Sequence, residues 1–369
     1  MTNRERALAA LNYQLYDKLP VVHFGFWKET REKWLEEGRI TRKEARSDHL
    51  TAERLGFDFE WQACANTGAG LRPGFPREVI KSFPDGTRHV RNGNGVVELE
   101  KDGVTSIRQE ISHLLEDREG WEAHYKPRLQ FTPDRLPKDD IKHEIKRLEK
   151  NDRGDRPVGL FIGSLYGTFR DWAGVTGTSY IYADDEDLYK EILDTIGDLC
   201  YRCLEETLAL CPPGLFDFAH MWEDICFKTG PLVIPDVFRE WVGPHYKRMT
   251  DLLRQHGTKL VSLDCDGCID ALLPIWLENG VNAMFPIEVG TWEASIEPWR
   301  AQYGKALRGV GGMNKNVFSL DFDAVDAEIE RLKPLVALGG YIPCPDHRIA
   351  PDAKWENVVY YVKRMREVF

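Results

Sequence analysis

The chain has 369 residues, of which 60 are acidic and 49 basic, so its formal net charge is −11. This balance argues against nucleic-acid or anionic-membrane partners, because binding to phosphates requires an excess of Lys and Arg. No apolar run reaches the roughly 20 residues of a membrane helix, and residues 1–15 lack the apolar core of a secretory signal. Eight cysteines are too few for a disulfide scaffold, so we expect a cytoplasmic protein with reduced thiols.

The first part of the chain alternates helix and strand signals. The predicted elements are a helix over 3–11, a strand over 21–27, helices over 28–37 and 41–55, and a strand over 57–63. The helix over 41–55 begins with Thr41 and Glu44, which have the spacing of a capping box. Gly56 marks its end, since glycine readily adopts the left-handed conformation of a helix terminus.

Residues 77–110 differ from the rest of the chain in their pattern of strand and turn residues. Turn signals at Asp85-Gly86, Gly93-Asn94-Gly95 and Asp102-Gly103 separate short β-rich runs, which is typical of hairpins. We therefore expect a small antiparallel meander that interrupts the main fold. The polar segment after it is broken by prolines and contains one charged helix near 139–151.

From Arg156 onward, apolar strand-like runs alternate with helical stretches. The six runs are 158–163, 216–222, 259–265, 281–287, 306–312 and 340–344. Together with the two earlier strands they make eight, and such alternation predicts a parallel (β/α)₈ barrel. An open doubly wound sheet is the alternative, but no Gly-x-Gly-x-x-Gly follows a strand. We predict an α/β protein with one barrel domain over 1–369, N-terminal helices and a β insertion near 77–110.

In such a barrel, catalytic groups lie at the carboxyl ends of the strands. The densest candidate segment is Asp264-Cys265-Asp266-Gly267-Cys268. Asp264 and Asp266 are two residues apart, so in an extended segment their side chains point the same way. Two such carboxylates stay ionised only if a cation or hydrogen-bond donors lie between them. The alternative is a solvated turn in which Asp266 caps the following helix.

Other strand ends add candidates whose alternative role is a salt bridge at the rim. His220, Glu223 and Asp224 follow one strand, and one of them can be a general base. Arg170 and Arg348 can each hold a substrate carboxylate, because guanidinium pairs with carboxylates bidentately. The remaining candidates for substrate contacts are the aromatic residues Phe24, Trp27, Tyr166 and Trp222.

Two cysteine pairs have the spacing of a zinc knuckle. Cys200 and Cys203 form one pair, and Cys265 and Cys268 form the other; a four-thiol zinc site would need both pairs together. The first pair lies in an apolar helical stretch, where thiols pack as small hydrophobic groups. Packing is therefore the favoured interpretation, and it also applies to Cys344 on the last predicted strand.

Motifs along essentially the whole chain occur in a familiar order. They are Asn3 to Leu8, Asp17 to Pro20, Asp85-Gly86, Trp172 to Gly174, Pro235 to Phe238, Pro244 to Lys247, Ile349 to Asp352 and Glu356 to Val358. This series resembles the uroporphyrinogen decarboxylase superfamily, whose fold is a (β/α)₈ barrel. The decarboxylase itself has an Arg-Gln-Ala-Gly-Arg stretch after its first strand. Here His23 to Lys28 stand in its place without arginines, so the resemblance points to the corrinoid-dependent methyltransferase branch.

The resemblance also implies a metal site. Zinc-binding members of that branch have a His-x-Cys pair, a Glu and a Cys near the last strand. The corresponding positions here are Asp264 and Asp266, then Glu288, and finally His347. Zinc accepts oxygen and nitrogen ligands, and carboxylates leave it more Lewis-acidic than thiolates do. Such a site suits a substrate with an oxygen leaving group.

The activity implied by the resemblance is methyl transfer from a small methoxylated or methylated compound to a corrinoid carried by a partner protein. We take Asp266, His220 and Glu223 as the catalytic candidates. One alternative is a metal-independent decarboxylase or lyase that acts on a small carboxylic acid. In that case Asp266 or His220 would donate the proton. Another alternative is a non-catalytic barrel that binds a small molecule, and a homodimer is compatible with the sequence.

Overall fold

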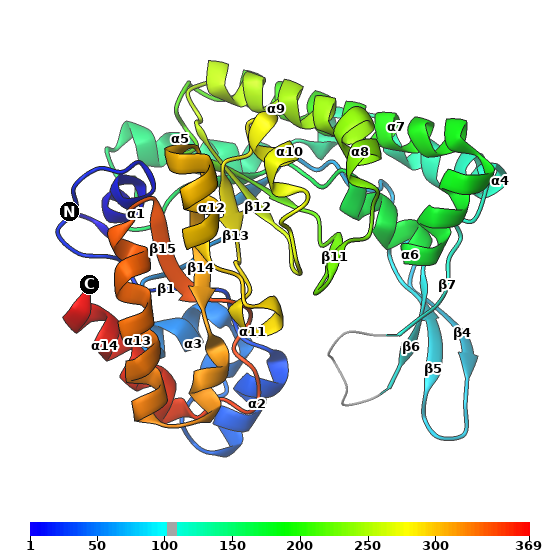
Figure 1. Ribbon diagram of the computed structural model, residues 1–369. Helices are drawn as coiled ribbons and strands as arrows, with labels where there is room; N and C mark the ends of the chain where they lie inside the picture. Colours follow the sequence, from blue (N-terminus) through cyan, green and yellow to red (C-terminus); the bar gives the residue numbers. More distant parts are fainter. Residues whose placement is uncertain (102–108) are drawn as a thin grey trace.

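The computed structural model describes residues 1–101 and 109–369, so the predicted turn at Asp102-Gly103 lies outside the described part. Its central feature is a set of parallel strands in two sheets, one of seven strands and one of two, which together we call the ring (Figure 1). The ring strands are β1 (Val22–His23), β2 (Phe59–Glu60), β3 (Ala65–Asn66), β8 (Gly159–Phe161), β9 (Phe218–Trp222), β12 (Leu260–Asp264), β13 (Ala283–Phe285), β14 (Arg308–Met313) and β15 (Tyr341–Pro345). The predicted α/β class and the eight predicted strand positions are confirmed.

The second strand position is divided. β2 pairs in parallel with β1, whereas β3 pairs in parallel with β8 and completes a seven-stranded sheet in the order β15-β14-β13-β12-β9-β8-β3. Residues 61–64 connect the two short strands. On the other side of β1, a parallel bridge joins Phe26 to Ile349, beyond the end of β15. The strands on either side of this point, β15 and β1, are therefore joined by a single bridge and not by a full ladder of hydrogen bonds.

Helices lie outside the ring, as expected for crossovers between parallel strands (Figure 1). The longer helices are α1 (Asn3–Leu11), α2 (Lys28–Glu36), α3 (Asp48–Leu55), α5 (Lys138–Glu149), α6 (Tyr166–Asp184), α7 (Glu186–Ala209), α9 (Gly243–Gln255), α12 (Ile296–Tyr303), α13 (Phe322–Ala337) and α14 (Trp355–Val368). The shorter ones are α4 (Arg118–Gly120), α8 (Pro235–Val237), α10 (Leu273–Glu278) and α11 (Val289–Trp292). Among the described residues, no helix is both long and apolar enough to cross a membrane.

One predicted helix is shorter than expected. Thr41 and Glu44 do exchange the two hydrogen bonds of a capping box, but only a single 3-10 turn over Glu44–Arg46 follows them. The chain then adopts an extended conformation at Ser47, whose side chain caps α3. The helix predicted over 41–55 was therefore wrong at its start. Its predicted end is correct, because Gly56 has the left-handed φ of 90°.

Two hydrophobic clusters hold the fold together. The larger cluster lies between the strands and the surrounding helices. The smaller one contains side chains from the ring interior, among them Phe59, Phe218 and Phe285, together with Leu11 of α1. The backbone N–H of Gly340, next to β15, donates to the carbonyl oxygen of Ala10. Helix α1 therefore closes the amino end of the ring, and the opposite end is left for the loops that carry chemistry.

The predicted meander is present. It consists of β4 (Glu78–Ser82), β5 (Arg88–Arg91), β6 (Val97–Glu100) and β7 (Glu110–Ser112), paired antiparallel in that order. In Figure 1 it projects below α6, away from the ring. A smaller hairpin, β10 (Cys226–Phe227) and β11 (Gly230–Pro231), follows the end of β9.

Candidate active site with an acidic cluster

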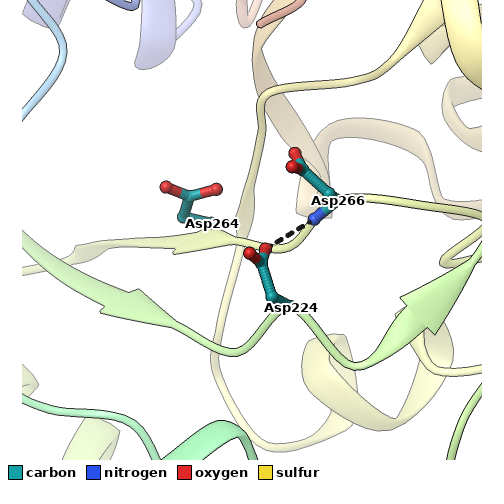
Figure 2. Close-up of side chains that lie close together, drawn as sticks. All are labelled: Asp224, Asp264 and Asp266. Atoms are coloured by element: carbon teal, nitrogen blue, oxygen red, sulfur yellow. Dashed lines mark hydrogen bonds between the residues drawn. The ribbon is translucent and has the colours of Figure 1, made fainter. Parts of the chain in front are cut away.

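Three aspartates meet at the carboxyl ends of β9 and β12. Asp264 is the last residue of β12, while Asp224 and Asp266 lie in the loops that follow β9 and β12. One carboxylate oxygen of each residue lies within 4.8 Å of the others. Figure 2 shows the three side chains and the hydrogen bond of 3.0 Å that the backbone N–H of Asp266 donates to Asp224. The two strands are parallel neighbours with Trp222 opposite Asp264, so their ends bring the carboxylates together.

The cluster is electrostatically unfavourable when it is fully ionised. Burial raises the pKa of Asp264 well above its usual range, and the charges of Asp224 and Asp266 raise it further. Burial and the charge of Asp266 likewise raise the pKa of Asp224 to about 6. The Oδ1 atom of Asp266 is buried and has no hydrogen-bond partner among the described residues. A positive charge at this place would offset the repulsion and supply the missing partner.

The local backbone explains how the cluster is held. Asp224 has a φ of 48°, a left-handed conformation that Asp tolerates better than most residues. Gly267 has a φ of 86°, and a side chain there would collide with the backbone oxygen of Cys226. Only glycine therefore allows the loop after Asp266 to pack against the hairpin after β9.

His347 borders this cluster. Its Nε2 atom lies 3.4 Å from Oδ2 of Asp266. The imidazole stacks on Trp27 at a centroid distance of 5.5 Å and meets the ring of Phe24 edge-on at 5.4 Å. Phe24 in turn packs edge-on against Phe285 at 4.5 Å. The predicted aromatic residues Phe24 and Trp27 therefore fix the orientation of the predicted ligand His347.

Glu288 has a different environment from the other predicted ligands. Its Oε2 atom accepts a 2.6 Å hydrogen bond from the backbone N–H of Gly267, and its Oε1 atom accepts one of 2.9 Å from the hydroxyl of Thr291. The residue is buried, which together with the charge of Asp266 raises the pKa of its carboxyl. Glu288 thus ties the loop after β12 to the loop after β13, and both of its oxygens already have partners.

Of the other predicted catalytic residues, His220 faces the ring interior. It lies in β9 among the rings of Phe161, Phe218 and Phe285. Only 7% of the residue is exposed, and its Nδ1 atom has no hydrogen-bond partner among the described residues. Burial lowers the pKa of His220 to about 4, so the imidazole is neutral near pH 7.

Glu223 is fully buried and makes four hydrogen bonds. Its carboxylate accepts from the backbone N–H groups of Leu165 and Gly167 at 2.9 and 2.5 Å, which belong to the start of α6. The hydroxyls of Ser164 and Tyr246 donate to it at 3.3 and 2.5 Å. These contacts attach the end of β9 to α6 and α9, and they leave no acceptor for a substrate.

The remaining predicted substrate contacts lie around the rim or away from it. The guanidinium of Arg170 lies 5.4 Å from the ring centroid of Trp222 and pairs with Asp171 at 3.1 Å. Arg348 pairs with Asp48 at 3.6 Å. Tyr166 is buried in a separate aromatic cluster with the rings of Phe169, Tyr189 and Phe238, between the helices.

Asp224 is the acidic residue that the predicted ligand set omitted. The signal for it was present, because Asp224 lies two residues after the predicted strand over 216–222, and that strand pairs with the strand that ends in Asp264. What the sequence did not reveal is that Glu223 turns into the protein while Asp224 turns toward the cluster. Cys265 lies between the two aspartates of its loop, but its Sγ atom is buried and accepts from the N–H of Ile225 at 3.4 Å. That thiol packs inside the loop.

No protein-family model matches this chain, and no curated protein matches it in sequence. Among solved structures, the chain is similar to a methyltransferase from Methanosarcina mazei, with 16% identity and a TM-score of 0.62 over 100% of this chain and 99% of that chain. It also aligns with a B12-independent methionine synthase from Shewanella sp. W3-18-1, with 11% identity and a TM-score of 0.45 over 95% and 98% of the two chains. The similarity to the methyltransferase shows a common fold.

Proposed function

We propose that this chain is a methyltransferase that takes a methyl group from a small methoxylated or methylated compound. The observation that carries the proposal is the cluster of Asp224, Asp264 and Asp266 at the carboxyl ends of the barrel strands, beside His347. Active sites of this fold lie at that end. The similarity to a methyltransferase of the same fold supports the choice of reaction.

The residues present fit a divalent cation. Three carboxylates repel one another, and a buried oxygen of Asp266 lacks a partner. Oxygen ligands with one imidazole form a set that zinc accepts. Asp224, Asp264, Asp266 and His347 would hold the ion, whereas Glu288 would position the loop through Gly267. When bound, the ion would stabilise negative charge on the oxygen or nitrogen that loses the methyl group.

The protein's own groups would prepare the site for this reaction. Trp27 and Phe24 hold the His347 ring beside the cluster. Burial of Asp264 strengthens the charge interactions that its carboxylate makes. The N–H that Asp266 donates to Asp224 keeps the two loops at a constant separation.

We propose that the methyl acceptor is a corrinoid carried by a partner protein, since the motifs of the chain resemble the corrinoid-dependent branch. We assign the reaction to the cytoplasm, because all eight cysteines are described and carry free thiols.

The test is a methyl-transfer assay with cob(I)alamin as the acceptor and methanol, methylamines and methoxylated benzenes as donors. We expect one donor class to consume cob(I)alamin, and elemental analysis to find one zinc ion per chain. Asp264→Ala should lose both the metal and the transfer. The surface variant Asp352→Ala, at an exposed position of the turn before α14, should keep both. Inactivity with every donor would contradict methyl transfer, and a protein that takes up no zinc would contradict the metal site.

One observation favours a second candidate function. Without a cation, the raised pKa of Asp264 keeps its carboxyl protonated to a higher pH than that of an ordinary aspartate, as a proton donor requires. Such a group would suit a decarboxylase or lyase, with Arg170 or Arg348 holding the acid. Both arginines already pair with aspartates, which weakens this alternative. Release of carbon dioxide from small acids by the zinc-free protein would support it.

A further inference from the structure

A groove of about 490 Å³, open to solvent, concentrates positive charge in an otherwise acidic chain. It lies between α2 and the residues of the 3-10 turn over Glu44–Arg46, with the residues just before that turn. Its charged lining consists of Lys28, Arg31, Arg42 and Arg46 and one acidic residue, Glu32. The whole chain has 60 acidic and 49 basic residues, so the groove reverses the overall charge balance locally.

The α2 side of the groove holds two of the cations. Lys28 and Arg31 are three residues apart, which places them on one face of the helix. Lys28 pairs with Glu32 at 3.3 Å, but both side chains are more than half exposed, so water and ions compete with this pair. Arg31 is mostly buried and pairs with Asp48 at 3.2 Å. Asp48 therefore holds the Arg31 guanidinium in place beside the groove.

The opposite side of the groove supplies two arginines that lack partners. Among the residues that the structure describes, neither Arg42 nor Arg46 has a side-chain hydrogen bond or an ion pair. Glu44 lies between them in the sequence, but its Oε2 atom accepts a hydrogen bond of 2.6 Å from the backbone N–H of Thr41. The capping box thus engages the acid of this turn, and both guanidinium groups remain available to a ligand.

The lining selects a ligand with several negative charges. Guanidinium pairs bidentately with phosphate oxygens, and the cationic residues of the groove outnumber the acidic one by three. A single carboxylate would offset little of this excess, whereas a diphosphate group offers one phosphoryl group to each side of the groove. Leu35 and Ala45 add apolar surface for the organic part of a ligand, and the volume is within the range of small-molecule pockets.

Acidic residues around the groove restrict the ligand to a compact one. Helix α2 also contains Glu29 and Glu36, and Glu37 follows directly. A nucleic-acid strand or an anionic membrane surface would extend past the groove and meet these carboxylates in a chain of net charge −11. A small anion would meet the cations of the lining alone.

The groove adjoins the candidate active site without overlapping it. Lys28 directly follows Trp27, whose ring stacks on the imidazole of His347. On the inner side, Asp48 pairs with Arg348 at 3.6 Å as well as with the α2 arginine. None of the three clustered aspartates lines the groove.

We propose that this groove is a second binding site, which takes a small molecule that bears a diphosphate group. One phosphoryl group pairs with Arg42 and Arg46, and the other lies on the α2 side with Lys28 and Arg31. The site is independent of the proposed methyl transfer, because no residue of the acidic cluster takes part in it.

The test is equilibrium dialysis of the full chain with pyrophosphate at constant ionic strength. We expect one pyrophosphate per chain and an affinity at least tenfold above that for orthophosphate. The double variant Arg42→Gln/Arg46→Gln should bind pyrophosphate at least about tenfold more weakly than the wild type. Its matched control is Arg202→Gln/Arg254→Gln, which removes the same charge from exposed positions of α7 and α9 and should bind as the wild type does.

Three results would overturn the proposal. They are the absence of saturable binding in the wild type, equal affinities in the two double variants, and equal affinities for pyrophosphate and orthophosphate. Asp264→Ala should keep the wild-type affinity, and a loss there would place the anion on a metal ion at the acidic cluster instead. A single-stranded oligonucleotide should not displace pyrophosphate, and effective displacement would contradict a compact site.

Discussion

Glu223 and Asp224 are neighbours in the chain, yet their carboxylates lie in opposite environments. Glu223 is fully buried and accepts from two backbone N–H groups and two hydroxyls. Asp224 faces two other aspartates and accepts one backbone hydrogen bond from Asp266. The first carboxylate holds helices to the barrel, and the second is poorly compensated. Both residues follow the same strand, so position at a strand end does not distinguish them. The number of hydrogen-bond donors around each carboxylate does: a carboxylate with many donors is a structural residue, and one with few is a candidate for the active site.

The largest expected effect concerns the structural side of this comparison. Glu223→Ala should lower the free energy of unfolding by about 3 kcal/mol or more, because it leaves the buried N–H groups of Leu165 and Gly167 and the Tyr246 hydroxyl without an acceptor. Urea unfolding would measure the loss. Asp224→Ala is the matched control and should cost less than about 1 kcal/mol, since it removes a repelling charge. Equal losses in the two variants would contradict the comparison.

On the functional side, Asp264→Asn should reduce methyl transfer by about 100-fold while the urea midpoint changes little. The amide has the shape of the acid but lacks its charge, so a cation would lose a ligand. Steady-state assays at several zinc concentrations would measure the effect. Glu288→Gln offers a contrast: its carboxylate positions Gly267, so we expect a smaller loss that additional zinc does not restore. A wild-type rate of methyl transfer in Asp264→Asn would show that the charge of Asp264 is not needed for the reaction.

The third prediction concerns pH. The pKa of Asp224 in the folded protein is about 6, which is above its usual value near 4. Its contribution to stability is therefore present below about pH 4 and is lost as the pH rises past about 6. Thermal unfolding across this range should show that the wild type loses stability relative to Asp224→Asn. Saturating zinc should reverse the trend, because a bound cation favours the ionised form. A pH dependence identical in both proteins would contradict the raised pKa.

The smallest expected effect is that of His347. Replacement by Phe keeps the ring contacts with Trp27 and Phe24 but removes the Nε2 atom that lies 3.4 Å from Asp266. We expect about a tenfold weaker affinity for zinc, which corresponds to about 1.4 kcal/mol, and an unchanged melting temperature. Titration with a metal indicator would report the affinity. His347→Ala, which also removes the ring contacts, should lose stability as well. If zinc binds His347→Phe with wild-type affinity, the imidazole is not a ligand.

The sequence predicted the eight strand positions because apolar runs alternate with helical periodicity over most of the chain. It did not predict the division between β2 and β3. Residues 57–63 have a strand-like pattern throughout, but the backbone pairs with β1 at β2 and with β8 at β3. Nor did it separate Glu223 from Asp224. That separation depends on the left-handed φ of Asp224 and on donors from α6 and α9, which are distant in sequence. Local patterns carry no information about such donors.

The division of the second strand has a consequence for how this barrel can change over evolutionary time. The backbone of β2 is anchored to β1 and that of β3 to β8, and the N–H groups of Trp61 and Cys64 still donate to His23 and Gly159 of those neighbouring strands. Gln62 and Ala63 therefore lie between the two ladders. Substitutions at Gln62 or Ala63 would reshape the wall of the open cavity that these two residues line, without shifting either anchor. The chain thus contains a short adaptable segment inside a rigid framework, and a new ligand preference can arise there by few substitutions.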